Sequence, residues 1–415
     1  MTTQGPGLTT PGSRRPVLRG LRVVEVSAFV AAPLAAATLV ELGADVVRVD
    51  PPGGGVDSRR WPVHNGRSLY WTGLNQGKRS VNIDMRTSRG QQLVADLIVS
   101  AGTCITNLPP ADWMNYRTLR TRRPDLVMAT ISGNGDGTVA VDYTINAALG
   151  FPWVTGPRTV EGPVNHVLPA WDLLTAQTTV TAVITAELHR ARTGEGSNLK
   201  IALADVALSA VAHLGLIAEA QLDQNPRGRF GNDVFGTYGR DFATADGRHV
   251  VVIALTRRQW RSLVDATETR AEMAEVEKQH AADLGDEARR WELREAISAI
   301  LAPWFKARTF KQIRSALDAH AVLWGPYQTF KQMLAEDPRA SPRNPLFAQV
   351  VQPGLGEVLT AASPIFVESA ERVPPGVAPA MGEHTRDVLQ DWLGLTHSDL
   401  DDLATNGVIA RVSEG

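Results

Sequence analysis

One aspartate near the middle of the chain stands where a carboxylate could act as a nucleophile. Asp172 lies in the run 168–173, LPAWDL. Proline is favoured at the first position of a helix, so Pro169 is expected to open a helix with Asp172 in or just past its first turn. The free N–H groups and the dipole of a helix start favour negative charge there. Position alone also fits an aspartate that only stabilises the helix.

The neighbours of Asp172 favour the chemical interpretation. Trp171, Leu173 and Leu174 are apolar, and a carboxylate that such residues surround is poorly solvated. Poor solvation makes a carboxylate a better nucleophile. These neighbours favour a nucleophilic role for Asp172, with an aspartate that only stabilises the helix start as the alternative.

Uncharged polar groups close to this aspartate could bind a substrate. His166 lies six residues before Asp172, and Asn165 precedes His166 directly. A histidine at this place could donate a hydrogen bond to a substrate carboxylate, or it could be an ordinary loop histidine. Gln177, a polar residue in an otherwise apolar run, is ambiguous in the same way.

The run 75–80, NQGKRS, is a second group of candidate binding residues. Gly77 permits an unusual backbone angle, and the cations Lys78 and Arg79 directly precede a strand-like run. Paired cations on a loop beside a parallel sheet suit the phosphate groups of a ligand. The alternative is a solvated pair on the surface.

The composition excludes several classes of protein. With 43% hydrophobic and 21% charged residues and a net charge of -2, the chain has an ordinary globular composition and not the concentrated basic surface of a nucleic-acid binder. No run of 18 apolar residues is present, so no membrane span is expected. The single cysteine, Cys104, excludes an internal disulfide and a cysteine metal cluster, and we predict no metal site. We expect a cytoplasmic protein.

Strands and helices must alternate to position these residues. Strand-like runs cover 21–26, 45–50, 80–84, 103–107 and 126–131, with helical segments at 31–42, 89–100 and 116–123. Strands separated by helices imply a parallel sheet, so the expected fold class is α/β with a Rossmann-like large domain. The turn 27–33, SAFVAAP, has no glycine that would let the backbone approach a pyrophosphate, which argues against dinucleotide binding.

A chain of 415 residues is expected to form two domains. We predict a disordered tail over 1–17, a large Rossmann-like domain over 18–225, a smaller α+β domain over 226–335, and a return to the large domain over 336–415. The smaller domain is expected to contain a hairpin within 234–254.

Several motifs in one order resemble CoA-transferase family III, which includes formyl-CoA and carnitine-CoA transferases and the α-methylacyl-CoA racemases. The resemblance extends from about residue 18 to 395. The motifs are LRGLRVVE at 18–25, LGADVVRVD at 42–50, NQGKRS at 75–80, SGNG at 132–135, RTGEG at 192–196 and GEHT at 382–385.

The resemblance implies a mechanism for Asp172. It would attack a thioester carbonyl to give an anhydride and CoA thiolate, and the thiolate would then form an aspartyl-CoA thioester. The partner implied is a small acyl-CoA, with CoA as part of the substrate and no tightly bound cofactor. An interlocked homodimer is typical of the family. CoA contacts are expected at Val30, Ala31, Asn75, Lys78, Arg79 and Asn107.

Departures from the family pattern narrow the activity. The racemases carry a His-Asp pair where this chain has Val141-Asp142, and a valine cannot move a proton. An arginine that some transferases place after the second strand is Pro51 here, and a lysine expected just before Asp142 is absent. CoA contacts that those members make through these residues are therefore not expected here.

Four segments, 27–33, 60–63, 141–144 and 165–172, resemble members that move CoA from the 1- to the 4-carboxyl of mesaconyl-CoA within one molecule. Such a site needs donors for the idle carboxylate, and His166, Asn165 and Tyr143 are the candidates. Intermolecular transfer between two carboxylic acids remains an alternative. A racemase and a non-catalytic CoA-binding protein are further alternatives.

Overall fold

The computed structural model describes residues 15–225 and 227–410. The chain divides into two compact units. The first contains the described residues of Met1–Ala148, Leu168–Glu219 and Pro338–Gly415, and the second contains those of Leu149–Val167 and Ala220–Asp337. Residues 149–167, which the sequence analysis assigned to the large domain, thus group with the second unit. The predicted tail, 1–17, lies almost wholly outside the described residues.

A parallel sheet with the order β5-β2-β1-β6-β7-β8 forms the centre of the first unit. Each neighbouring pair is parallel, which confirms the predicted α/β fold. The strands are β1 (Arg22–Val26), β2 (Asp45–Asp50), β5 (Arg79–Asn82), β6 (Thr103–Thr106), β7 (Val127–Ser132) and β8 (Ser197–Ala202).

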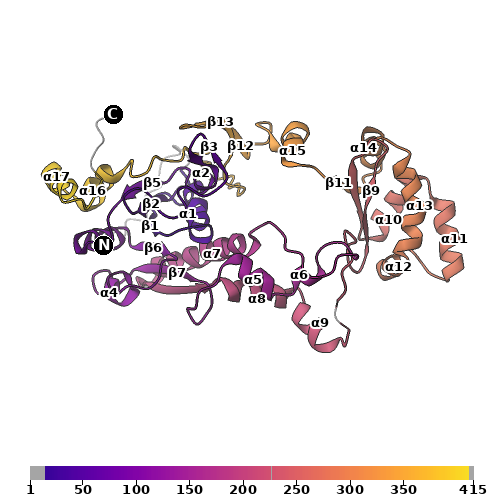
Figure 1. Ribbon diagram of the computed structural model, residues 1–415, viewed down its shortest axis with the longest axis horizontal. Helices are drawn as coiled ribbons and strands as arrows, with labels where there is room; N and C mark the ends of the chain where they lie inside the picture. Colours follow the sequence, from indigo (N-terminus) through magenta and orange to yellow (C-terminus); the bar gives the residue numbers. More distant parts are fainter. Residues whose placement is uncertain (1–14, 226, 411–415) are drawn as a thin grey trace, which may run out of the picture. The chain divides into compact units, whose positions relative to one another are not determined.

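Apolar side chains leave this sheet on both faces, because successive residues of a strand point to opposite sides. Val23 packs with helices α1 (Ala31–Glu41) and α7 (Ala170–Thr193) on one face. Its neighbour Val24 packs with α3 (Ser88–Ala101) on the other. Figure 1 shows α1 and α7 next to the strands. The buried sheet is therefore a rigid base for the loops at its ends.

The remaining elements of the first unit are short. They are the hairpin β3 (Val63–His64) and β4 (Arg67–Ser68), α2 (Leu69–Leu74), a 3-10 helix (Asp112–Met114), α4 (Tyr116–Arg120), α5 (Asp142–Ala148), α8 (Leu203–His213), a 3-10 helix (Pro338–Ala340), the hairpin β12 (Phe347–Gln352) and β13 (Gly356–Ala361), α16 (Thr385–Leu393) and α17 (His397–Thr405). The helix α9 (Leu216–Leu222) spans the boundary between the units.

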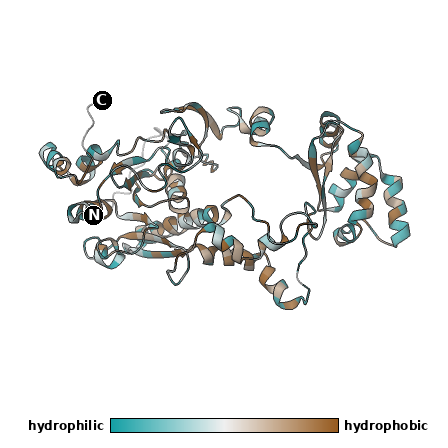
Figure 2. Cartoon of the chain, in the orientation of Figure 1, coloured by the Kyte–Doolittle hydropathy of each residue, from teal (hydrophilic) through white to brown (hydrophobic). Residues whose placement is uncertain are grey.

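The second unit is built on an antiparallel sheet with the order β11-β10-β9. Phe242 stacks on Phe305 in its core, with 4.4 Å between ring centroids. The elements are α6 (Phe151–Val154), β9 (Tyr238–Ala243), β10 (His249–Ala254), α10 (Arg257–Thr267), α11 (Arg270–His280), α12 (Glu287–Glu292), α13 (Arg294–Lys306), α14 (Phe310–Ala319), β11 (Leu323–Pro326) and α15 (Phe330–Glu336). Its helices carry both hydrophilic and hydrophobic residues along their length (Figure 2), as surface helices of an α+β domain do.

Within the described residues, no single helix has the length and apolar character to cross a membrane. The consecutive helices α8 and α9 meet those criteria only when taken together, and they are bent by 64° relative to each other.

Candidate active site

Asp172 lies in the first turn of α7, as the sequence predicts. The helix begins at Ala170, and Pro169 is its N-cap and not its first helical residue. Pro169 has no side chain that could accept a hydrogen bond from the first turn. The free N–H groups at the start of α7 therefore need an acceptor from elsewhere in the fold.

Asp142, the first residue of α5, provides that acceptor. Its Oδ2 accepts hydrogen bonds from the backbone N–H of Trp171 at 2.8 Å and of Asp172 at 3.1 Å. The Trp171 indole N–H also donates to Asn146 Oδ1 of α5 at 3.2 Å. Asp142 is buried, at 2% exposure. The start of α7 is thus held in place by α5, a capping role that the sequence analysis did not identify.

Two effects raise the pKa of the Asp172 carboxyl to about 6. Burial of the half-buried side chain is the larger cause, and the negative charge of Asp142 adds to it, while Arg60 acts in the opposite direction. The carboxylate is therefore ionised at neutral pH but poorly solvated, which is the state that a nucleophile requires.

Arg60 and Tyr70, which sequence reasoning missed, lie in the same electrostatic neighbourhood. Both come from the connection between β2 and β5. The Arg60 guanidinium lies 4.9 Å from the centroid of the Tyr70 ring. Burial raises the pKa of Tyr70 to about 12, with a further contribution from Asp172. The resemblance of segment 60–63 pointed to this region, but no property of the sequence connects it to Asp172.

The predicted substrate-binding residues separate into two groups. Tyr143 follows Asp142 in α5, is 49% exposed, and contributes to the raised pKa of Tyr70. Asn165 and His166 belong to the second unit. His166 Nδ1 is buried there without a hydrogen-bond partner in the described part of the chain. Only Tyr143 therefore shares a unit with Asp172.

Lys78 and Asn75 are not exposed to a ligand in this structure, contrary to the sequence-based expectation. Lys78 is 2% exposed, and its Nζ donates to Pro33 O at 2.8 Å and Asn75 Oδ1 at 3.0 Å and pairs with Glu25 at 2.7 Å. Asn75 is 1% exposed. Every proton of the ammonium group has a partner inside the protein, so the geometry does not support a phosphate contact.

Lys78 belongs to a buried network of charges beneath the loop after β1. Arg48 pairs with Asp50 at 2.9 Å, Asp57 at 3.0 Å and Glu25 at 3.3 Å. Burial alone would raise the pKa of Glu25, but Lys78 and Arg48 together hold it below its usual range. Burial lowers the pKa of Lys78 to about 8, although Glu25 opposes this. Each of these charges has a partner inside the protein, so removing one of them would leave an uncompensated buried charge.

The other predicted CoA contacts lie at the carboxyl ends of β1 and β6. Asn107 follows β6 and holds the loop after β1, since its side chain accepts from Ala28 N at 2.9 Å and donates to Ala28 O at 2.7 Å. Val30 and Ala31 are buried at the start of α1. The winding of the sheet reverses between β1 and β6, which is where α/β sheets bind ligands.

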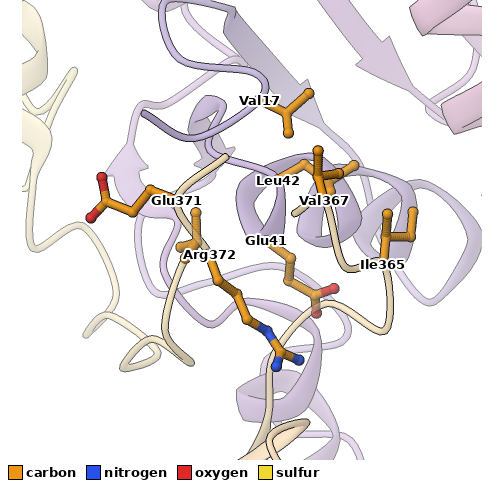
Figure 3. A pocket seen from close by; sticks show the side chains of 8 residues that line it. Val17, Glu41, Leu42, Ile365, Val367, Glu371 and Arg372 are labelled. Atoms are coloured by element: carbon orange, nitrogen blue, oxygen red, sulfur yellow. The ribbon is translucent and has the colours of Figure 1, made fainter. Parts of the chain in front are cut away.

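Arg79 points away from this place. It pairs with Asp45 at 2.6 Å and Asp391 at 3.3 Å, so its predicted ligand contact has no support from the geometry. Figure 3 shows a separate small pocket between Glu41 and residues 365–373. Burial raises the pKa of Glu41 to about 7. The pocket contains none of the predicted site residues.

The first unit is a doubly wound parallel sheet. A poorly solvated aspartate, Asp172, lies in the first turn of the capped helix α7. This is the framework of an enzyme that can use a carboxylate in catalysis. Residues 18–385 match the model of CoA-transferase family III, and the chain belongs to this family. The family resemblance seen in the sequence is thereby confirmed.

The chain is similar to two curated proteins from Chloroflexus aurantiacus. It is 46% identical to a 2-methylfumaryl-CoA isomerase over 95% of this chain and 98% of the relative. It is 30% identical to a succinyl-CoA–D-citramalate CoA-transferase over 96% of this chain and 100% of the relative. The crystal structure of a CAIB/BAIF family protein from Brucella suis matches with a TM-score of 0.76 and 25% identity, over 92% of this chain and 100% of that one.

Proposed function

We propose that this protein moves CoA between the two carboxyl groups of mesaconyl-CoA within one active site, the reaction of a 2-methylfumaryl-CoA isomerase. The half-buried Asp172 carboxylate, with its pKa raised to about 6, is the observation that carries this proposal. The 46% identity to a relative of that name supports the substrate.

The reaction proceeds by covalent steps on Asp172. Its carboxylate attacks the thioester carbonyl carbon, the C–S bond breaks, and an acyl-aspartyl anhydride and CoA thiolate form. The thiolate attacks the aspartyl carbonyl of the anhydride, which gives an aspartyl-CoA thioester and the free diacid. The diacid turns, and its other carboxylate reverses both steps. Atoms, protons and electrons balance without a further reactant, and the exchange of thioesters is nearly neutral in energy.

Asp142 positions the nucleophile in this scheme. Its two hydrogen bonds fix the backbone of Trp171 and Asp172, and its negative charge keeps the Asp172 carboxylate reactive by raising the pKa. Water must stay away from the anhydride, and the buried Trp171 beside the nucleophile serves this purpose.

Intermolecular transfer between two acids is the second candidate, because the 30% identical relative is named as a transferase between two acyl groups. The two activities differ in one requirement. An intramolecular enzyme converts mesaconyl-1-CoA to the 4-isomer when no other acid is present, whereas an intermolecular enzyme is inactive until a free acceptor acid is added.

We also propose that the enzyme is a cytoplasmic homodimer and that the loop after β1, with Val30, Ala31 and Asn107, contacts CoA. Asn107 supports the loop through two hydrogen bonds at the carboxyl ends of β1 and β6. His166 remains a proposed donor to the idle carboxylate, since its Nδ1 has no partner in the described residues.

The test is to follow mesaconyl-1-CoA alone by chromatography and to trap the thioester with hydroxylamine. Wild-type enzyme is expected to form the 4-isomer and to carry the hydroxamate on Asp172 by mass spectrometry. Asp172→Asn is expected to lose activity by about 10³-fold or more. Asp205→Asn is the matched control, because Asp205 is an exposed acid in the first turn of α8. A hydroxamate at another residue, or conversion only after an acid is added, contradicts the proposal.

A further inference from the structure

We propose that Arg60 and Tyr70 form a subsite for the idle carboxylate of a dicarboxylyl-CoA and hold the released diacid next to Asp172. The inference rests on the proposed function, and it names the residues that recognise a dicarboxylyl-CoA over a monocarboxylyl-CoA. This subsite lies on the first unit and is additional to His166, Asn165 and Tyr143, the carboxylate donors proposed from the sequence.

The Arg60 guanidinium has no hydrogen-bond acceptor in the part of the chain that the structure describes. Unlike Arg48, which pairs with three carboxylates, Arg60 donates no side-chain hydrogen bond and forms no ion pair within residues 15–225 and 227–410. Two rings flank it instead, Tyr70 at 4.9 Å and Phe29 at 5.5 Å. Aromatic faces orient a guanidinium without using its N–H groups. All its donors therefore remain available for bidentate binding of a carboxylate.

The Tyr70 hydroxyl provides a second donor. Its oxygen is buried and has no hydrogen-bond partner among the described residues. A buried hydroxyl without a partner destabilises the folded protein, so a ligand that accepts its proton is favoured. With a pKa of about 12, Tyr70 stays protonated and can only donate to a carboxylate at neutral pH.

The backbone around both residues is held firmly. Arg60 N donates to Asp57 O at 3.1 Å. Ser68 Oγ donates to Arg60 O at 2.5 Å and accepts from Trp71 N at 3.0 Å, so it joins the Arg60 backbone to the start of α2. These bonds fix the backbone that carries Arg60 and the start of the helix that carries Tyr70 before any ligand binds, as a binding site requires.

The subsite and the nucleophile act on each other electrostatically. Arg60 lowers the pKa of Asp172, and Asp172 raises that of Tyr70. Release of the diacid from its thioester adds a negative charge close to the aspartyl-CoA. A cation and a hydroxyl beside Asp172 compensate for this charge, so the diacid stays while it turns. The acyl group of a monocarboxylyl-CoA has no second carboxylate that could bind there.

The experiment compares the variants Arg60→Gln, Arg60→Lys and Tyr70→Phe with the wild type. The control is Arg59→Gln, because Arg59 is exposed and adjacent to Arg60. Isomerisation of mesaconyl-1-CoA is measured with ¹³C-labelled free mesaconate present. We expect kcat/KM to fall about 100-fold in Arg60→Gln and about tenfold in Tyr70→Phe. If the diacid escapes, labelled mesaconate should replace it, so Arg60→Gln and Tyr70→Phe should incorporate more label into the CoA ester per turnover. Arg59→Gln should match the wild type. Arg60→Lys, which keeps the charge, should recover part of the loss.

A second measurement separates this inference from the proposed function. Binding of mesaconate and of its uncharged dimethyl ester to resting enzyme is followed by thermal shift, which requires no turnover. Mesaconate should raise the Tm of the wild type and of Arg59→Gln, but not of Arg60→Gln, and the dimethyl ester, which has no carboxylate, should raise none. Equal binding of mesaconate by wild type and Arg60→Gln overturns the subsite even if the enzyme isomerises. Arg60-dependent binding without isomerisation supports the subsite and contradicts the proposed reaction.

Discussion

Two carboxylates meet at the start of α7 and have different surroundings. Asp142 is buried and accepts two backbone hydrogen bonds, whereas Asp172 is half-buried and has a raised pKa. Asp142 Oδ2 is occupied by two backbone N–H groups, and its Oδ1 is buried without a hydrogen-bond partner among the described residues. Asp172 is the more accessible of the two carboxylates. We therefore propose Asp172 as the nucleophile and Asp142 as the residue that positions it.

The raised pKa predicts the pH dependence of the reaction. Only the ionised form of Asp172 attacks, and the pKa of its carboxyl is about 6. We expect kcat/KM to be constant above pH 7, to fall through pH 6, and to reach about one tenth of its maximum at pH 5.

Asp142→Asn tests the origin of this dependence. The amide oxygen can still accept from the backbone, but the negative charge that raises the pKa of Asp172 is lost, so the acid limb should move to lower pH. Asp142→Ala removes the acceptor too and should cost about 0.5–2 kcal/mol of stability. An acid limb that stays in place in Asp142→Asn would contradict this account.

At the scale of elements, the connection between β2 and β5 has two parts with different roles. Its first part, with Asp57, closes the buried network around Arg48. Its later part contains Arg60, which lowers the pKa of Asp172, and Tyr70, whose pKa Asp172 raises. The network anchors the loop after β1 as well, because Asp57 Oδ2 accepts from Phe29 N at 3.0 Å. Rigid support of this kind holds side chains in place before substrate binds.

Replacing Lys78 should therefore affect folding before it affects CoA binding. Lys78→Met leaves the fully buried Glu25 without its amine, and breaking a buried ion pair costs about 3–5 kcal/mol. We expect a large drop in the urea midpoint and an unchanged KM for the folded fraction. Arg79→Met, which removes only partly exposed ion pairs, is the control and should cost about 1 kcal/mol or less. A raised KM with unchanged stability would restore the predicted CoA contact of Lys78.

At the scale of the whole molecule, the proposed homodimer makes a prediction of its own. Several large apolar side chains of the first unit are exposed, among them Val139 at 94% and Leu214 at 68%. Exposed apolar surface is expected where a second subunit covers it. Light scattering after size-exclusion chromatography should give twice the mass of one chain. A monomeric mass at micromolar concentration would contradict the dimer.

Periodicity and local chemistry were sufficient for much of the fold. The alternation of strands and helices predicts the parallel sheet, because each strand needs helices on both faces. Pro169 and the apolar run after it likewise predict the helix start and the poor solvation of Asp172. The hairpin of the second unit follows from its turn residues. Each of these features depends on residues that are close together in the sequence, so it can be predicted from the sequence alone.

The partners of buried charges depended on the tertiary structure. The sequence predicts that Lys78 is a loop cation. In the fold it is buried and paired with Glu25, which lies 53 residues earlier. The cap on α7 comes from Asp142, and Arg60 and Tyr70 reach Asp172 from more than 100 residues away. Charges interact through space, and burial strengthens the interaction. The sequence by itself determined the sheet and the helix, and it pointed to Asp172 as the proposed nucleophile. The pKa of Asp172, the cap of its helix and its spatial neighbours were decided only when distant segments packed together.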